Sequence, residues 1–187
     1  INSTASDTAN LPFGGDGGFC AIDHENPNYT YGEYIYAQVH RSTNGGSSAD
    51  YITSGLSDAG SAANFIAPFI LDPNNPNTMY VGANSLWRSQ NVRTTASWSA
   101  VRAPGNDYIS AIAVAPGNSS VVWVGQNNGQ VWRTTNANLA TPTWTAIDNN
   151  SSPNPFPNRY VTRIYFDPQN ASIIYVTFGG FATNNLY

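Results

Sequence analysis

The sequence predicts an all-β fold, and three observations support this. Short apolar runs alternate with turns rich in Pro, Asn and Gly throughout the 187 residues, without helical periodicity. The same pattern of residues returns about every 50 residues, which is the period of propeller blades. Each complete repeat contains four such runs. We therefore predict a β-propeller segment of four-stranded antiparallel blades, about three and a half in number and incomplete.

A turn sets the register of each repeat. The residue before it is acidic in three of the four repeats, and the four positions are Asp23, Asp72, Ala115 and Asp167. An Asp here can accept hydrogen bonds from backbone N–H groups of the turn, and a following Pro presets φ. Because one repeat carries Ala at this position, we interpret these carboxylates as turn-formers rather than catalytic groups.

The run before each turn predicts the first strand of a blade. Apolar side chains stand one and three residues before the turn position, the alternation of a strand with one buried face. The pairs are Cys20 and Ile22, Phe69 and Leu71, Ile112 and Val114, and Ile164 and Phe166. Cys20, the single cysteine, cannot form an intrachain disulfide. We predict that it is buried in the core rather than reactive.

The second strand carries an aromatic residue at one repeat position, which we predict to be equivalent and mostly buried between blades. The four residues are Tyr31, Tyr80, Trp123 and Tyr175. The fourth strand is marked by Tyr51, Trp98 and Trp144.

The third strand repeats an apolar-aromatic-Arg pattern. It reads Val39-His40-Arg41, Leu86-Trp87-Arg88 and Val131-Trp132-Arg133, and Leu186-Tyr187 begins it again. We interpret His40 as a packed aromatic substitute rather than a base. Because the arginines share one repeat position, we expect them to donate hydrogen bonds between blades rather than to bind a ligand carboxylate.

These repeats predict one propeller segment over residues 1–187. The repeats run over approximately 14–58, 64–105, 107–149 and 159–187, and the last is truncated. Propellers close with about 4–8 blades. We therefore expect a segment of a longer protein, with the remaining blades of that chain as partners.

The segment after each third strand begins with Ser or Thr and has Asn two residues later. The three segments are Ser42-Thr43-Asn44-Gly45-Gly46, Ser89-Gln90-Asn91 and Thr134-Thr135-Asn136. With the aromatic residue of the fourth strand, they resemble a degenerate Asp-box, the S-x-D-x-G-x-x-W hairpin of sialidase-type and sortilin-like propellers, with Asn at the acidic position. The run GGDGGFCAID and the following YGEYIYAQVHRSTNGG are similar to secreted bacterial BNR repeat proteins. The resemblance implies a propeller fold and an extracellular or cell-surface location, and it specifies no activity.

Composition excludes two classes of partner. The net charge of −4 and the pI near 4.8 argue against nucleic acid, which requires a basic face. No apolar run reaches the roughly 20 residues needed to span a bilayer, so we predict no membrane insertion. The chain has no lysine and is rich in Asn, Ser and Thr, which favours an exported protein.

Two carboxylates depart from their repeat positions. Asp16 stands where the other repeats have Phe65, Tyr108 and Tyr160, and Glu33 stands where they have Gly82, Gly125 and Thr177. The turn after Asp23 would bring the start of the first strand beside the end of the second. Asp16 and Glu33 are therefore the candidate ligand-binding residues, and Asp16 is the candidate metal ligand. The alternative is that Asp16 caps a glycine turn and Glu33 faces solvent.

No cofactor is predicted for the chain as a whole. A calcium ion with backbone and Asn oxygens is one way to compensate the repulsion between Asp16 and Glu33, and a cluster of sugar hydroxyls is another. The sequence favours a non-catalytic extracellular scaffold or binding module for protein or glycan ligands. The alternative is an Asp-box propeller glycoside hydrolase that uses this carboxylate pair, because that chemistry requires two carboxylates.

Overall fold

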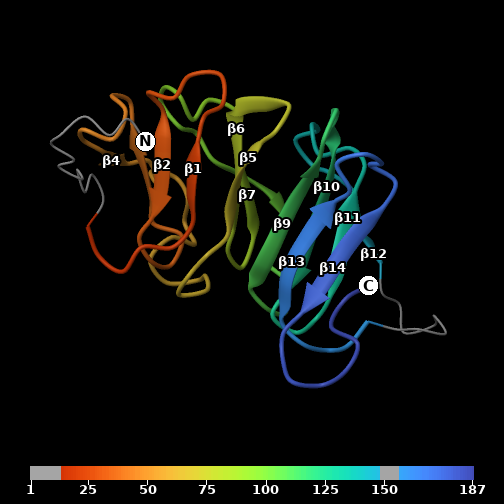
Figure 1. The fold of residues 1–187 in the computed structure, drawn as a ribbon. Coiled ribbons are helices and arrows are strands. Elements are labelled where there is room, and N and C mark those ends of the chain that lie inside the picture. Colours follow the sequence, from red (N-terminus) through yellow and green to blue (C-terminus); the bar gives the residue numbers. More distant parts are fainter. Residues whose placement is uncertain (1–13, 148–155) are drawn as a thin grey trace, which may run out of the picture.

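The computed structural model describes residues 14–147 and 156–187, and in these ranges all regular structure is β-strand (Figure 1). The first sheet contains β1 (Cys20–Ile22), β2 (Thr30–Glu33), β3 (Val39–Ser42) and β4 (Asp50–Tyr51). The second contains β5 (Phe69–Asp72), β6 (Asn75–Gly82), β7 (Leu86–Ser89) and β8 (Ser99–Arg102). The third contains β9 (Ile109–Ala115), β10 (Asn118–Gln126), β11 (Val131–Thr134) and β12 (Thr145–Ala146). The fourth contains β13 (Val161–Phe166) and β14 (Ile174–Phe178).

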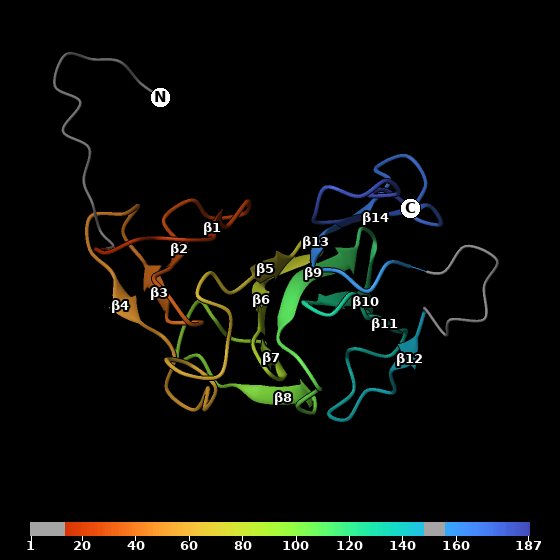
Figure 2. The ribbon, with the colours of Figure 1, turned by 90° about the horizontal axis from the view of Figure 1, so that it is seen from below.

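Within every sheet the strands pair antiparallel in the order of the sequence. Figure 2 shows the sheets arranged as a fan, with β1, β5, β9 and β13 toward one side and β4, β8 and β12 on the outer rim. This is an incomplete β-propeller segment, as the sequence predicts. The exact repeat boundaries stay a prediction.

The turn carboxylates behave as their position suggests. Asp23 Oδ1 accepts the backbone N–H of Glu25 at 2.9 Å, and Asp72 Oδ1 accepts that of Asn74 at 2.9 Å. Asp167 Oδ1 accepts the N–H of Gln169 at 2.8 Å. Each side chain thereby satisfies a donor that the β-ladder leaves unpaired at the turn.

Three hydrophobic clusters fill the junctions between adjacent sheets. The predicted aromatic position contributes Tyr31 and Tyr80, each 1% exposed, and Trp123, 9% exposed. Tyr31 packs against the second sheet, Tyr80 against the third and Trp123 against the fourth. Tyr175 occupies the equivalent register opposite Tyr165 but is 40% exposed, because no described strand covers that face of the fourth sheet. The prediction of burial is therefore wrong for Tyr175.

Cys20 is exposed, so the prediction that it lies in the core is also wrong. Its equivalents Phe69 and Ile112 face the preceding sheet and are buried there. No described sheet precedes the first one, so this face of β1 is open, and Ile22 is 66% exposed as well. Only Ala21, on the opposite face of β1, packs against the following sheet.

The segments after the third strands share one hydrogen-bond pattern, in which an Asn carbonyl oxygen organises the loop. Asn44 Oδ1 accepts from Ser42 Oγ at 2.9 Å and from the Ser48 backbone at 3.0 Å. Asn91 accepts in the same way from Ser89 and Ser97, and Asn136 from Thr134 and Thr143. An amide oxygen can do this because both donors need only an acceptor.

In the described ranges there is no helix with the length and apolar character that crossing a bilayer would require.

Candidate functional site

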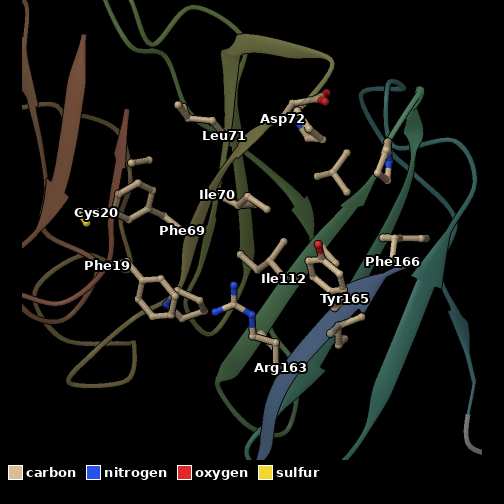
Figure 3. Close-up of a pocket in the computed structure, with 18 of the residues that line it drawn as sticks. Phe19, Cys20, Phe69, Ile70, Leu71, Asp72, Ile112, Arg163, Tyr165 and Phe166 are labelled. Carbon is tan, nitrogen blue, oxygen red and sulfur yellow. The ribbon is translucent and has the colours of Figure 1, made fainter. Parts of the chain in front are cut away.

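The first strands of the four sheets surround a hollow of about 540 Å³, shown in Figure 3. β1, β5, β9 and β13 each contribute several lining residues. Because successive strand residues alternate between faces, each strand gives the hollow both backbone and apolar side chains. The wall is mainly aliphatic and aromatic, which is the usual character of a ligand pocket with few polar groups.

Two exposed side chains of β13 give this hollow its distinctive chemistry. Arg163 and Tyr165 are two residues apart on one strand and therefore lie on the same face. Both are exposed, Tyr165 to 52%, on the face of the fourth sheet that it shares with its register partner Tyr175 and that no described strand covers. In Figure 3 the Arg163 guanidinium points away from β13 toward Phe19, whereas the Tyr165 ring lies over β9 and β13 in this view. This face offers a cationic hydrogen-bond donor beside an aromatic ring.

The other acidic and basic groups that line the hollow are less available to a ligand. Asp72 is buried, and its Oδ1 accepts from both the backbone and the side-chain amide of Asn74. His24 is exposed in the turn after β1. Neither Arg163 nor Tyr165 was predicted as a site residue from the sequence. The signal that could have found them is their departure from repeat positions that hold Ala111 and Ala113 in the preceding blade.

Glu33, one of the two predicted site residues, is the last residue of β2 and is 2% exposed. Its Oε1 accepts the backbone N–H of Ala37 at 3.3 Å and that of Ala67 at 3.2 Å. Since Ala67 lies in the segment that leads into β5, this carboxylate links the first two sheets. The alternative that Glu33 faces solvent is therefore wrong.

The second oxygen of Glu33 has a different environment. Oε2 is buried without a hydrogen-bond partner and lies against Gly18, where an added Cβ would be 2.0 Å away. Burial raises the pKa of Glu33, although the N–H groups of Ala67 and Ala37 act in the opposite direction. The site therefore favours a protonated carboxyl more than water does.

Asp16, the other predicted site residue, is exposed and precedes the strand that the sequence assigned to it, since β1 begins at Cys20. The backbone ladder extends as far as Gly18, whose N–H donates to Glu33 O at 3.0 Å. Asp16 therefore lies two residues before Gly18, the backbone hydrogen-bond partner of Glu33. Among the described residues, no three His, Cys, Asp or Glu side chains form a group that could hold a metal ion.

His40 packs as an aromatic residue. It is buried, and its ring centroid lies 3.8 Å from that of Tyr51 with a tilt of 33°. Burial lowers the pKa of His40, and the nearby Asp50 opposes this effect. The packed ring and the lowered pKa agree with the interpretation of His40 as an aromatic substitute.

Most described carboxylates serve the fold. Asp23 and Glu25 pair with Arg93, and Asp58 Oδ2 accepts from the Ser85 backbone and from Trp87 Nε1. Asp167 also accepts from Tyr175 Oη. Together with Asp72 and Glu33, six of the chain's eleven acidic residues are thus committed to turns or to contacts between segments. Few carboxylates remain for acid–base chemistry in the described ranges.

No family model and no curated protein matches the sequence. Solved propeller structures are similar in fold. An ancestral GH74 enzyme matches at a TM-score of 0.64 and 23% identity over 90% of this chain and 22% of its own. A nutrient-binding protein from Bacteroides thetaiotaomicron matches at 0.61 and 12% identity over 89% and 36%.

The GH74 xyloglucanase from Xanthomonas campestris matches at a TM-score of 0.61 and 11% identity, over 87% of this chain and 27% of its own. The chain thus spans between about a fifth and about a third of these three structures. Identities this low show the fold alone, and the fold is that of a β-propeller.

Proposed function

We propose that this segment is a non-catalytic binding module of an extracellular propeller protein and that its ligand is a glycan held in the hollow of the first strands. The single observation that carries the proposal is the pairing of an exposed aromatic ring, Tyr165, with an exposed guanidinium, Arg163, on one face of that hollow. An aromatic face can pack against the C–H groups of a sugar ring, and guanidinium N–H groups can bind its oxygens.

The size and lining of the hollow support this choice. Its volume of about 540 Å³ lies within the range of ligand sites, roughly 300–1,000 Å³. The similar structures include a xyloglucanase and a nutrient-binding protein, so related folds serve both reaction and binding. Non-catalytic binding is favoured here because most described carboxylates already serve turns and contacts between sheets.

Titration calorimetry with neutral and uronic-acid-containing oligosaccharides tests the proposal. Tyr165→Ala is expected to weaken binding about tenfold, which corresponds to about 1.4 kcal/mol. Arg163→Ala should weaken acidic oligosaccharides more than neutral ones. Tyr160→Ala is the matched control, because Tyr160 is comparably exposed but does not line the hollow. Equal affinity of all variants for every sugar would refute the glycan assignment, and binding of a polypeptide instead would make the segment a protein-binding module.

The same samples test the alternative function. A glycoside hydrolase that uses Asp16 and Glu33 would release shorter sugars, and Asp16→Asn would abolish the release. We expect no release, because Glu33 is buried and its Oε1 accepts two backbone N–H groups.

In second place we propose a ligand or calcium site at Asp16 and Glu33. The observation in its favour is the buried Oε2 of Glu33, which lacks a hydrogen-bond partner. Calcium takes about 6–8 oxygen ligands, so backbone and Asn oxygens would have to complete the shell. Calcium titration of the chain and of Asp16→Asn decides the matter. Identical responses of the two proteins, or none, would end this proposal.

A further inference from the structure

Hydrogen bonds between neighbouring sheets recur along the segment. Arg88 of β7 donates to the backbone carbonyl of Ala137, and Trp144 Nε1, next to β12, donates to that of Val101 at 2.9 Å. Arg41 of β3 donates in the same way to backbone carbonyls of the loop between β7 and β8. The expectation that these arginines bond between blades is therefore confirmed for Arg41 and Arg88.

Arg102, the last residue of β8, follows Val101 and lies at the junction of the second and third sheets. Its guanidinium carbon stands 4.8 Å from the centroid of the Trp132 ring, which is a cation–π contact. Its Nη2 lies 3.5 Å from Gln126 Oε1, a long and weak hydrogen bond. The guanidinium is therefore held mainly by the face of the indole.

Two stronger hydrogen bonds fix the orientation of Gln126, which is fully buried. Its Nε2 donates to the backbone carbonyl of Asp107 at 2.7 Å, and its Oε1 accepts from Trp132 Nε1 at 3.1 Å. Because the donor end of the amide is committed to a carbonyl, the acceptor end faces Arg102. Gln126 and Trp132 thus form a rigid seat for the guanidinium.

The guanidinium of Arg102 has no carboxylate partner in residues 14–147 and 156–187, where the ion pairs involve Arg93. Its Nη1 is buried and lacks a hydrogen-bond partner. Burial lowers the pKa of Arg102, but a guanidinium remains charged at neutral pH. The junction therefore contains a cation with an unused donor group and no counter-ion.

This junction departs from the pattern of the preceding one. At the equivalent position of the second sheet, Trp87 Nε1 donates to the carboxylate of Asp58 at 2.9 Å. Counted from the aromatic residue of the fourth strand, Gly55 takes the place of Arg102 in the first sheet. An acid beside the indole is thus replaced by an amide and a base, and packing of the indole alone does not require this change.

Residues 103–107 form a surface loop over the guanidinium, and three of the five are exposed. An added Cβ at Gly105 would lie 2.6 Å from Gln126 Nε2 and 3.2 Å from Arg102 Nη1. The N–H of Gly105 donates to the carbonyl of Asn84 at 3.3 Å, which is a long hydrogen bond. Nη1 is therefore covered by a weakly tethered glycine at the surface.

We propose that Arg102, Trp132 and Gln126 form a binding site for a carboxylate group of a small ligand. The carboxylate would accept from the guanidinium through Nη1, and residues 103–107 would move aside to admit it. A carboxylate suits the site because its planar pair of oxygens matches the guanidinium fork and its single charge compensates one cation. The site goes beyond the proposed function, because none of these three residues lines the hollow of the first strands.

Thermal unfolding in sodium glucuronate, compared with glucose and sodium chloride at equal sodium concentration, tests the proposal. Glucuronate at about ten times its Kd should raise the melting temperature of the wild-type chain by about 3–6 °C, because it binds the folded state. Arg102→Met keeps a long side chain without the charge and should abolish this rise. Arg133→Met, which removes an exposed arginine, is the matched control and should retain it.

Sodium acetate identifies the group that is recognised. A rise with both acetate and glucuronate would show that the carboxylate is sufficient, and a larger rise with glucuronate would show that the sugar adds contacts. Calorimetry should give a glucuronate affinity at least about tenfold weaker for Arg102→Lys, because lysine keeps the charge and loses the planar fork. Arg102→Lys also provides a second variant if Arg102→Met does not fold.

Amide hydrogen exchange of the wild-type chain needs no variant. Glucuronate should speed exchange at Gly105, because its N–H leaves the Asn84 carbonyl when the loop moves. Unchanged exchange at Gly105 would overturn the inference.

An equal melting-temperature rise in Arg102→Met, or an equal rise with sodium chloride, would also overturn the inference. Loss of the glucuronate effect in Arg163→Ala but not in Arg102→Met would place the acidic ligand in the hollow and have the same consequence. Failure of neutral sugars to bind would bear on the proposed function and leave this result unaffected.

Discussion

Arg93 in the β7–β8 loop reaches back to the first sheet and contacts both carboxylate oxygens of Asp23. Its Nε lies 2.6 Å from Oδ2, and its Nη2 lies 2.8 Å from Oδ1 and 2.8 Å from Glu25 Oε2. Asp23 is fully buried, whereas the Arg93 side chain is 25% exposed. A turn-forming carboxylate of one blade is thus neutralised by the next blade.

We predict that Arg93→Ala destabilises the chain by about 1–3 kcal/mol in urea unfolding, because it leaves a buried carboxylate with backbone donors only. Arg163→Ala, which removes an exposed arginine, should change the unfolding free energy by less than about 0.5 kcal/mol. Equal effects of the two variants would contradict a role for the Asp23 contact.

The loss of folding stability at low pH should depend on the Arg93 side chain. Burial alone would raise the pKa of Asp23, but Arg93 and the N–H groups of Glu25 and Asn26 outweigh it and hold the pKa below its ordinary value of 3.8. The stability contributed by a lowered pKa is present above the unfolded value and is lost as the pH falls through the folded value. Arg93→Ala should therefore flatten the fall in stability below about pH 4. Parallel pH profiles would argue against this assignment.

Glu33 should give a pH dependence of opposite sign. Because burial raises its pKa above 4.5, its contribution to stability is complete below that value and is lost as the pH rises through the folded pKa. Glu33→Gln keeps a carbonyl acceptor for Ala37 and Ala67 and does not ionise. Melting temperatures measured upward from pH 4.5 should therefore fall more for the wild-type chain than for Glu33→Gln. The same slope in both proteins would exclude Glu33 as the titrating group.

The inter-sheet indole bonds can be tested by comparing tryptophans. Trp98→Phe removes the donor to the Ile52 carbonyl, and we expect it to lose about 0.5–1.5 kcal/mol for the bond in addition to the lost packing. Trp123→Phe is the reference, because the Trp123 Nε1 is buried without a hydrogen-bond partner. Chemical denaturation should show the larger loss for Trp98→Phe although Trp123 is the more buried residue. A larger loss at Trp123 would mean that packing outweighs the hydrogen bond.

Gly125 should be intolerant of a side chain. A Cβ there would lie 2.4 Å from Val161 Cγ1, because the Val161 side chain of the fourth sheet packs directly against this position. Gly125→Ala should cost about 1–3 kcal/mol, and adding Val161→Ala should recover part of that loss. Gly14→Ala is the control, since a Cβ there meets nothing within 4 Å. Additive losses in the double variant would show that the two residues do not clash.

Repetition explains why the sequence predicted the fold well and the site poorly. Turn carboxylates, strand alternation and inter-blade arginines recur, so each predicted position is supported by several occurrences in the sequence. The local pattern of the repeats also agrees with their tertiary packing. The errors at Cys20 and Tyr175 have one cause, since burial of a repeat position depends on a neighbouring sheet that strand periodicity does not reveal. Asp16 and Glu33 were correctly noticed as departures from the repeat. Whether such a side chain faces a ligand site or hydrogen-bonds to the backbone depends on its direction, which the sequence does not show. The hollow is formed by residues from four separate strands, and only the assembled fan brings them together.

The open face of β1 makes the single thiol of the chain useful as a reporter. Cys20 is exposed and lies in the wall of the hollow, on the strand facing β13 across it. A maleimide dye attached there would sit on the open face of β1, opposite the face that packs on the second sheet, and a change in its emission would register anything that covers this face without any added cysteine. A spin label at the same atom would report the distance to a second label and so follow the spacing between the first and last sheets in solution.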